Sequence, residues 1–158
     1  MDDDGVEILL VEDNDNDELL ALHAFMKNNV VNKVHVVRDG VEALDYIFCT
    51  GAYAKRKIEN PKLVLLDLKL PFIDGIEVLR RIRGNPRTRL VPVVVLTTSS
   101  QESDVIETYA LGDNSYIVKP VDYDQFSAVA KQLEFYWLQL NRQPARAHGT
   151  SLEVMPNL

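Results

Sequence analysis

The sequence is poor in the residues that characterise several large classes of protein. It has a single cysteine, Cys49, in 158 residues, which excludes an internal disulfide and is typical of a reducing compartment. No apolar run approaches the roughly 20 residues that a membrane-spanning helix needs. The acidic N-terminus lacks the basic and apolar regions of a signal peptide. We therefore expect a cytoplasmic protein that does not interact with a membrane.

Basic residues are also scarce. The chain has 17 Lys and Arg against 24 Asp and Glu, for a net charge of −7. Direct binding to nucleic acid needs clustered Lys and Arg to neutralise phosphates, so we do not expect nucleic acid as a partner. With 46% hydrophobic residues, 7 Gly and 7 Pro, the composition is that of one globular domain with a proper core.

Short apolar runs alternate with segments of helical spacing along the chain. The runs are rich in Val, Ile and Leu, and several are apolar on both faces, as in parallel strands that helices cover on both sides. Strand alternating with helix five times predicts an α/β fold with a doubly wound parallel sheet. The predicted strands lie at 6–11, 33–37, 62–67, 91–97 and 115–119, and the predicted helices near 15–28, 39–49, 75–83, 102–111 and 122–140.

The helical spacing also predicts which side chains are buried. On the first helix, Leu19, Leu22, Phe25 and Met26 share one face. The shared face of the second helix consists of Val41, Leu44 and Phe48. Asn14 or Asp15 is the expected cap of the first helix, and Gly112 the expected end of the fourth.

Two segments depart from this alternation. The connection 50–61 is longer than usual, and we interpret it as a solvated insertion, with a partner contact as the alternative. Residues 141–158 have no periodicity and contain Pro, Gly and polar residues. We therefore expect a domain over 1–140 and a flexible tail over 141–158.

Polar side chains follow the predicted strands at the points where these end. Glu12 and Asp13 follow the first strand and Asp67 the third, while Thr97 closes the fourth and Lys119 the fifth. The carboxyl ends of parallel strands meet at one edge of the sheet, where sites form in such folds. Three carboxylates, a hydroxyl and an ammonium are thus expected to converge.

Clustered carboxylates repel one another, and a hard divalent cation removes that repulsion. A site made only of oxygen ligands suits Mg²⁺. The acids just beyond the strand end, Asp15, Asp17 and Glu18, have a simpler explanation. Negative charge is favoured at a helix N-terminus, so we interpret these three as a solvated helix start.

Four motifs carry a family resemblance over about residues 6 to 140: "LLVEDNDND", "LVLLDLKLPFIDG", "VVVLTTS" and "YIVKP". In this order and at these separations they resemble the response regulator receiver domain of two-component signalling. The resemblance implies a flavodoxin-like (β/α)5 fold with strand order 2-1-3-4-5. The long 50–61 connection, "VVVLTTSS" and "FYWL" more narrowly resemble the stand-alone regulators of bacterial phytochrome kinases.

The resemblance implies a role for each residue at the sheet edge. Asp67 is the expected phosphoacceptor for a sensor histidine kinase, and Lys119 the partner of the phosphoryl oxygens, aimed by a cis Lys119–Pro120 bond. Thr97 and Tyr116 are the expected switch pair. The expected Mg²⁺ ligands are Glu12, Asp13, Asp67 and the backbone carbonyl of Lys69.

The last predicted helix has more apolar residues than one face needs. At ~100° per residue, one stripe covers the sheet, and Phe135 and Leu138 fall on the opposite side, with Tyr136 at the border. We expect a homodimer through these three residues, with a tail that folds back over them as the alternative. The residues of the stripe are Tyr123, Phe126, Val129, Ala130, Leu133, Trp137 and Leu140.

The sequence therefore predicts a single-domain response regulator without a DNA-binding output domain. It would accept phosphate on Asp67, lose it again, and act on a downstream phosphotransfer or effector protein, without being an enzyme for a separate substrate. One alternative is a haloacid-dehalogenase-like phosphatase, which needs a second Asp where this chain has Lys69. The other is an interaction module that works without phosphorylation, against which the intact set of site residues argues.

Overall fold

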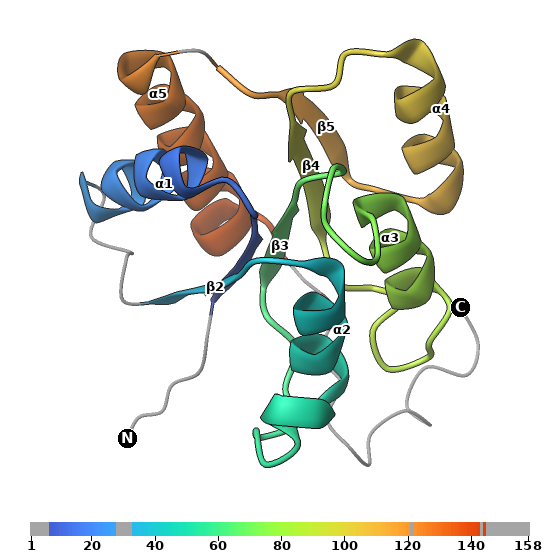
Figure 1. Ribbon diagram of the computed structural model, residues 1–158. Helices are drawn as coiled ribbons and strands as arrows, with labels where there is room; N and C mark the ends of the chain where they lie inside the picture. Colours follow the sequence, from blue (N-terminus) through green and yellow to red (C-terminus); the bar gives the residue numbers. More distant parts are fainter. Residues whose placement is uncertain (1–6, 28–32, 121, 143, 145–158) are drawn as a thin grey trace.

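The computed structural model describes residues 7–27, 33–120, 122–142 and 144, and its centre is a five-stranded parallel sheet (Figure 1). The strand order is β2-β1-β3-β4-β5, so the predicted fold class and order are confirmed. The inner strand β1 pairs with both β2 and β3, and Ile8 lies opposite Val34 and Leu63. The strands are β1 (Ile8–Val11), β2 (Val34–Val37), β3 (Leu63–Leu66), β4 (Val93–Thr97) and β5 (Ser115–Val118).

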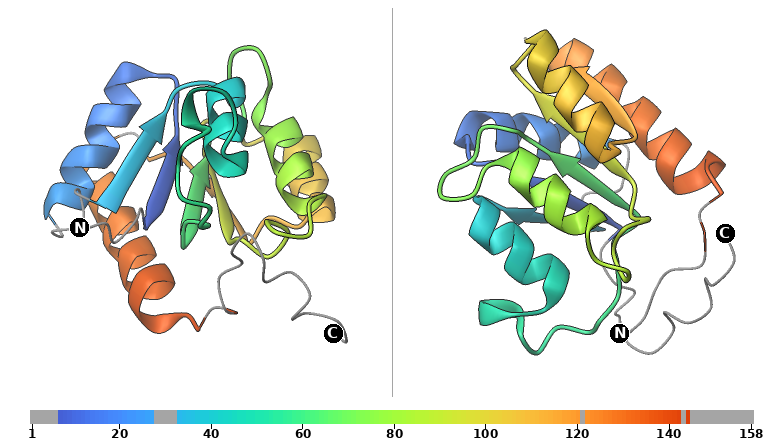
Figure 2. Two further views of the ribbon diagram at one scale, coloured as in Figure 1. Left: turned by 90° about the horizontal axis from the view of Figure 1, so that it is seen from below. Right: turned by 90° about the vertical axis from the view of Figure 1, so that its right-hand side faces the viewer.

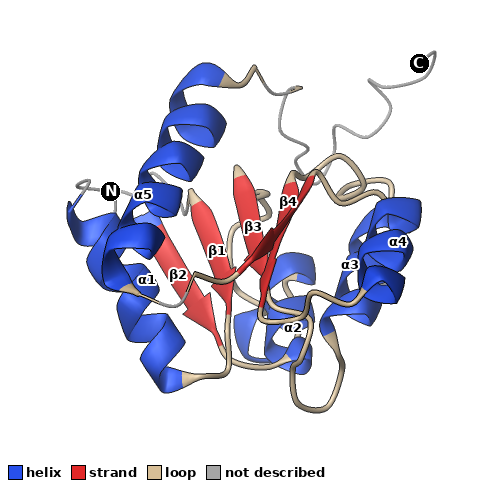
Figure 3. Cartoon of the chain, turned by 90° about the horizontal axis from the view of Figure 1, so that it is seen from above, coloured by secondary structure: helices blue, strands red, loops and turns tan. Residues whose placement is uncertain are grey.

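Helices cover both faces of this sheet (Figures 2 and 3). On one face lie α1 (Asp15–Lys27) and α5 (Tyr123–Leu133), which we call the α1–α5 side. On the other lie α2 (Gly40–Phe48) and α3 (Gly75–Arg83), with α4 (Glu102–Leu111) beside α3. Strand side chains alternate between the two: Leu10 packs on the α1–α5 side, and Val11 packs with α2 and α3.

This alternation decides where the polar residues after the strands point. Glu12 follows Leu10 by two residues and Asp67 follows Leu65 by two, so both are directed to the α1–α5 side. A slip of one residue in the pairing would bury the wrong face of each strand, so the apolar core fixes the register. The position of both carboxylates is thus a consequence of core packing.

The buried face of α1 is narrower than predicted. Ala21, Ala24 and Phe25 are buried, whereas Leu19 and Met26 are exposed. Small alanines let α1 approach the sheet and α5 closely, and the side chains at the border of the stripe then remain outside. Val41, expected on the buried face of α2, is also exposed. Asn14 is the cap of α1, and its Oδ1 accepts from the Asp17 N–H at 2.9 Å.

The end of the last helix winds differently from its beginning. Residues Glu134–Leu140 form a π-helix, in which successive side chains turn by less than 100°. The smaller turn per residue brings Leu138 closer to the side of Leu133, five residues earlier, and Leu138 is partly buried against the same core cluster. The predicted place of Leu138 on the outer side is therefore wrong, and so is that of Leu140, which is exposed. Tyr123, at the start of α5, is also exposed.

Most of the connection 50–61 is exposed, as expected of a solvated insertion, and the half-buried Tyr53 and Arg56 anchor it to the domain. It contains the short 3-10 helix Gly51–Tyr53. The Arg56 guanidinium lies 4.0 Å from the centre of the Tyr46 ring and donates to the Tyr46 carbonyl at 3.0 Å. On the other side of that ring, His35 stacks at 4.5 Å.

Among the described residues, no helix has both the length and the apolar character needed to cross a membrane. Gly112, with φ 95°, ends α4 as predicted, because a left-handed residue there closes the last turn.

Candidate functional site

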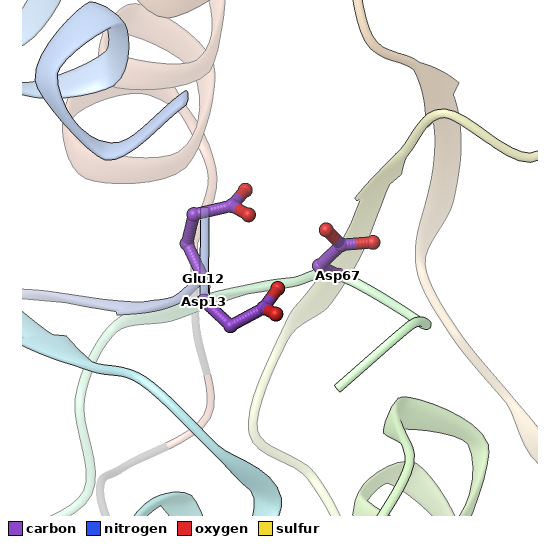
Figure 4. Close-up of side chains that lie close together, drawn as sticks. All are labelled: Glu12, Asp13 and Asp67. Carbon is purple, nitrogen blue, oxygen red and sulfur yellow. The ribbon is translucent and has the colours of Figure 1, made fainter. Parts of the chain in front are cut away.

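Three carboxylates meet at the carboxyl edge of the sheet (Figure 4). Glu12 and Asp13 follow β1, and Asp67 follows the neighbouring strand β3. One oxygen from each lies within 4.8 Å of the others, which is close enough for a shared metal ion. Glu12 and Asp67 are buried, whereas Asp13 is exposed.

The ammonium of Lys119 lies among these acids. Its side chain is 5% exposed, and its Nζ is 2.6 Å from Glu12 Oε1 and 2.9 Å from Asp67 Oδ2. Lys119 follows β5, the edge strand, and β4 separates it from β3, so its long stem must reach across β4. The sequence predicted that Glu12, Asp67 and Lys119 lie close together, because each of them follows a parallel strand.

Negative charge exceeds positive charge in this pocket. Burial raises the pKa of the Glu12 carboxyl to about 7, and nearby Asp67 adds to the shift although Lys119 opposes it. Burial alone would lower the pKa of Lys119, but the carboxylates of Asp17, Glu12 and Asp67 together raise it. Both shifts follow from excess negative charge in a desolvated site. Three oxygen donors with unbalanced charge fit a hard divalent cation.

Asp17 belongs to this site, and its interpretation as a solvated helix start is wrong. Its Oδ2 lies 2.7 Å from Lys119 Nζ. Asp17 lies in the first turn of α1, which begins four residues after the last residue of β1, and from there its side chain reaches Lys119. This spacing was visible in the sequence, but the position of Lys119 beside it was not. Asp15, by contrast, is exposed.

Thr97 and Tyr116 lie on the β4 side of the pocket. Thr97 is fully buried, and its Oγ1 accepts from the Ser99 N–H at 3.4 Å. The Tyr116 hydroxyl donates to the Ser99 carbonyl at 2.9 Å, and the Ser99 hydroxyl donates to Asp104 at 2.6 Å. The two predicted switch residues thus contact the same short segment after β4.

The loop after β3 holds the Asp67 backbone tightly. A Cβ on Gly75, the first residue of α3, would lie 2.2 Å from the Asp67 carbonyl oxygen, so only glycine allows this approach. The Lys69 N–H donates to Asp67 Oδ1 at 3.4 Å. The Ile73 N–H donates to the Pro71 carbonyl at 2.8 Å around Phe72, whose φ is 68°. This γ-turn with positive φ is a rare and strained form, here on an exposed aromatic residue.

The predicted cis bond before Pro120 is wrong. The described residues contain no cis peptide bond. The two isomers of a bond before proline differ by only about 0.5–1 kcal/mol, so local sequence does not decide between them. Lys119 reaches the acids with the trans bond.

Similarity to known proteins agrees with this geometry. The sequence profile of the response regulator receiver domain matches residues 8–131. The chain is 39% identical to the probable methanogenesis regulatory protein FilR2 of Methanothrix harundinacea, over 92% of each protein. It is 38% identical to response regulator Rcp1 of Synechocystis sp., over 87% of this chain and 92% of Rcp1.

Solved structures are similar over the same region. The Mn²⁺-bound form of Rcp1 has a TM-score of 0.79, covers 87% of this chain and 98% of its own, and is 38% identical. The phosphorylated cyanobacterial phytochrome response regulator RcpA has a TM-score of 0.82 and 40% identity, over 89% of this chain and 99% of its own. Receiver domains bind a divalent metal and interact with histidine kinases, and this chain belongs to the response regulator receiver domain family.

Proposed function

We propose that Asp67 accepts a phosphoryl group from a phosphohistidine of a sensor histidine kinase. One observation supports this most directly: the buried Asp67 carboxylate contacts the Lys119 ammonium at 2.9 Å beside the carboxylates of Glu12 and Asp13. Phosphoryl transfer needs a positioned nucleophile and cations that neutralise the charge of the phosphoryl group, and an anionic carboxylate next to a fixed ammonium and a metal-binding cluster meets both needs.

In the proposed reaction, an Asp67 oxygen attacks the phosphorus atom. A P–O bond forms while the P–N bond of phosphohistidine breaks, and the electron pair of that bond stays on the imidazole nitrogen. Lys119 pairs with a phosphoryl oxygen, and the Thr97 hydroxyl donates to another. Hydrolysis of the aspartyl phosphate returns the protein to its starting state, so no separate substrate is turned over.

We propose Mg²⁺ as the metal, held by Glu12, Asp13, Asp67 and the backbone carbonyl of Lys69. The all-oxygen donor set and the exposed position of Asp13, which leaves room for metal-bound water, support this choice. Bound there, the cation offsets the charge of the carboxylates and of the incoming phosphoryl group.

Thr97 and Tyr116 are the proposed switch. A phosphoryl group can shift a balance between two states only through contacts that differ between them. The Thr97 hydroxyl would turn toward the phosphoryl group, and Tyr116 would exchange its contact with the Ser99 carbonyl for another. The changed surface would then bind a downstream phosphotransfer or effector protein.

We propose a phytochrome-type kinase as the partner, in a stand-alone regulator of the cytoplasm. The similarity to RcpA, a phytochrome response regulator, supports the first part. The alignment with RcpA and Rcp1 over nearly their full lengths supports the second. The proposed receiver domain is 1–140, with a flexible tail over 141–158. Of this tail, residues 143 and 145–158 lie outside the described residues.

The two alternative functions are not favoured. A dehalogenase-type phosphatase needs an acid two residues after its nucleophile, and that position holds the exposed Lys69. An interaction module independent of phosphorylation gives no reason for a buried Lys119 among acids.

Labelling of the purified protein by a phytochrome-type kinase and radiolabelled ATP tests the proposal. The wild-type protein should acquire label that is stable in acid and labile in base, as an acyl phosphate is. Asp67→Asn should acquire none while remaining folded, because the amide is nearly isosteric but a poor nucleophile. Equal label on both proteins would refute Asp67 as the acceptor.

A homodimer is also proposed, through Phe135 and Tyr136. Leu138 is left out of the proposed surface because it is partly buried against the core cluster, whereas Leu140 is exposed and is added to it. The exposed fractions are 53% for Phe135, 46% for Tyr136 and 61% for Leu140, an unusual cluster for one helix end.

A further inference from the structure

Asp17 is an acid of the pocket to which the proposed phosphoryl transfer gives no role. It lies in the first turn of α1 and contacts Lys119 at 2.7 Å. The group of oxygens that could share a metal ion contains those of Glu12, Asp13 and Asp67, not that of Asp17. The side chain is about one-third exposed, so it faces the pocket from its open side.

All three N–H donors of the Lys119 ammonium have a carboxylate within reach. The partners are Glu12 at 2.6 Å, Asp17 at 2.7 Å and Asp67 at 2.9 Å. An ammonium has three donors and no acceptor, so the resting pocket satisfies it completely. Any phosphoryl oxygen that binds Lys119 must therefore take over one of these three positions.

Two of the partners change their bonding when the proposed reaction proceeds. Glu12 would be a ligand of the bound metal ion, and Asp67 would become an acyl phosphate with less charge on its carboxyl oxygens. Asp17 takes part in neither change. It is thus the one carboxylate of the three that can keep its contact with Lys119 from the resting state to the phosphorylated state.

A closed ring of hydrogen bonds holds the Asp17 carboxylate in contact with Lys119. The Asn14 N–H donates to Glu12 Oε2 at 3.2 Å, and Asn14 Oδ1 accepts from the Asp17 N–H at 2.9 Å. Asp17 Oδ2 then accepts from Lys119, which in turn contacts Glu12. The ring therefore consists of four residues, Glu12, Asn14, Asp17 and Lys119, and it links the N-terminal cap of α1 to the lysine that follows β5.

We propose that Asp17 is a positioning residue for Lys119, which holds its ammonium over Asp67 while Glu12 and Asp67 exchange partners. This inference rests on the proposed function. Lys119 reaches Asp67 from the edge strand through a flexible four-carbon stem with many rotamers. A second anchor beside the acceptor removes most of those rotamers before the phosphoryl group arrives, and positioning of this kind accelerates transfer.

The test compares Asp17→Ala with Asp15→Ala, which removes the same charge from the same turn of α1 but from an exposed side chain. Radiolabelled acetyl phosphate with Mg²⁺ serves as phosphodonor, so that no kinase surface is involved. Asp17→Ala should be labelled about fivefold more slowly than Asp15→Ala, or slower still, as expected when a positioning contact is lost. Asp17→Glu should restore most of the rate, because a longer carboxylate can still reach the ammonium.

Two readouts separate positioning from a general structural effect. The ammonium signal of Lys119 in ¹H–¹⁵N spectra, assigned with Lys119→Met, should persist in Asp15→Ala and exchange away in Asp17→Ala. In a Lys119→Met background, Asp17→Ala should slow labelling no further, because it acts only through the lysine.

Equal rates and equal ammonium signals in Asp17→Ala and Asp15→Ala would overturn the inference, and so would a full additional loss in the Lys119→Met background. Failure of the proposed function has a different signature. In that case wild-type protein and Asp67→Asn take up the same label, and the ammonium signal alone decides whether Asp17 holds Lys119.

Discussion

At the scale of single residues, neighbouring acids in this chain have different surroundings although they share one stretch of sequence. Glu12 is buried against Lys119, Asp13 is exposed at the metal-binding cluster, and Asp15 faces solvent. Asp17, one turn further on, contacts Lys119 again. The direction of each side chain from the strand end or helix turn, rather than its charge, decides its role.

Asp13→Asn should weaken Mg²⁺ binding by about tenfold, because one of three carboxylate ligands becomes a neutral amide; tenfold corresponds to about 1.4 kcal/mol. Asp15→Asn is the matched control, since it removes the same charge two residues away and outside the cluster. Isothermal titration with Mg²⁺ measures both. Equal losses in the two variants would mean that the cation responds to overall charge and not to this site.

His35, in β2, belongs to a second polar group, which is half-buried and also contains Glu42 and Tyr53. Tyr53 has one hydroxyl proton and donates it to Glu42 at 2.8 Å. The contact between His35 Nε2 and the Tyr53 oxygen, at 3.1 Å, therefore requires His35 to donate. Burial lowers the pKa of His35, Glu42 opposes this shift, and Arg56 and Arg38 add to it.

This lowered pKa gives a signed dependence of stability on pH. Near and below the ordinary histidine pKa of about 6.5, the unfolded chain binds more protons than the folded one at this residue, so the free energy of unfolding rises with pH there. Acidification from about pH 8 to pH 5 should therefore destabilise wild-type protein more than His35→Gln. Urea unfolding measures the difference, with His23→Gln on the exposed side of α1 as control. Parallel pH profiles for the wild-type protein and His35→Gln would contradict this.

At the scale of elements, the start of α3 controls the acceptor. Gly75→Ala would place a Cβ 2.2 Å from the Asp67 carbonyl oxygen, so the loop must move. We expect a loss of about 1–3 kcal/mol in the free energy of unfolding, as overpacking typically gives, and slower labelling of Asp67. Gly84→Ala, at the end of the same helix, meets its nearest atom at 3.2 Å with an ordinary φ of −85°. Its effect should stay within about 0.5 kcal/mol, and denaturant titration compares the two.

The positions of the helices and strands could be predicted from the sequence, but the side chains that each helix buries could be predicted only in part. Apolar runs and helical spacing located the five strands and the five α-helices, because burial of β1 and β3 on both faces leaves a clear pattern, but they did not predict the 3-10 helix at Gly51–Tyr53. The exposure of Leu19 and Met26 depends on how closely α1 docks, which its own sequence does not contain. Leu138 was misplaced because a π-helix changes the turn per residue, and an assumed period of 100° then fails.

At the scale of the whole molecule, the site follows from topology. In the order β2-β1-β3-β4-β5, β2 lies on one side of β1 and the later strands follow on the other, so the order changes direction at β1. The strands that carry Glu12 and Asp67 are therefore neighbours, although 55 positions (67 − 12) separate the two residues along the chain. Ligands bind at such switch points, outside the carboxyl ends of the strands. The acceptor, the metal cluster and Lys119 were predictable for this reason. Asp17 was not, because its contact needs the relative placement of α1 and β5, which is a property of the packed molecule.

The π-helical end of the molecule provides the last prediction, on self-association. Phe135, Tyr136 and Leu140 are exposed there, and their burial at roughly 25 cal/mol per Å² would contribute a few kcal/mol before the costs of association. We expect a reversible dimer of micromolar affinity, which Phe135→Lys with Leu140→Glu should convert to a folded monomer. Leu138→Lys should instead destabilise the fold, because Leu138 packs on the core.

The matched control for this surface is Leu19→Lys with Met26→Glu, which removes equally exposed apolar side chains from α1 and should leave association unchanged. Sedimentation equilibrium at about ten to one hundred micromolar covers the expected range of affinity. A wild-type protein that stays monomeric across that range, with and without phosphorylation, would rule out the dimer. Association that survives the change at Phe135 and Leu140 but is lost with the α1 pair would move the interface to α1, because only the altered surface distinguishes the two variants.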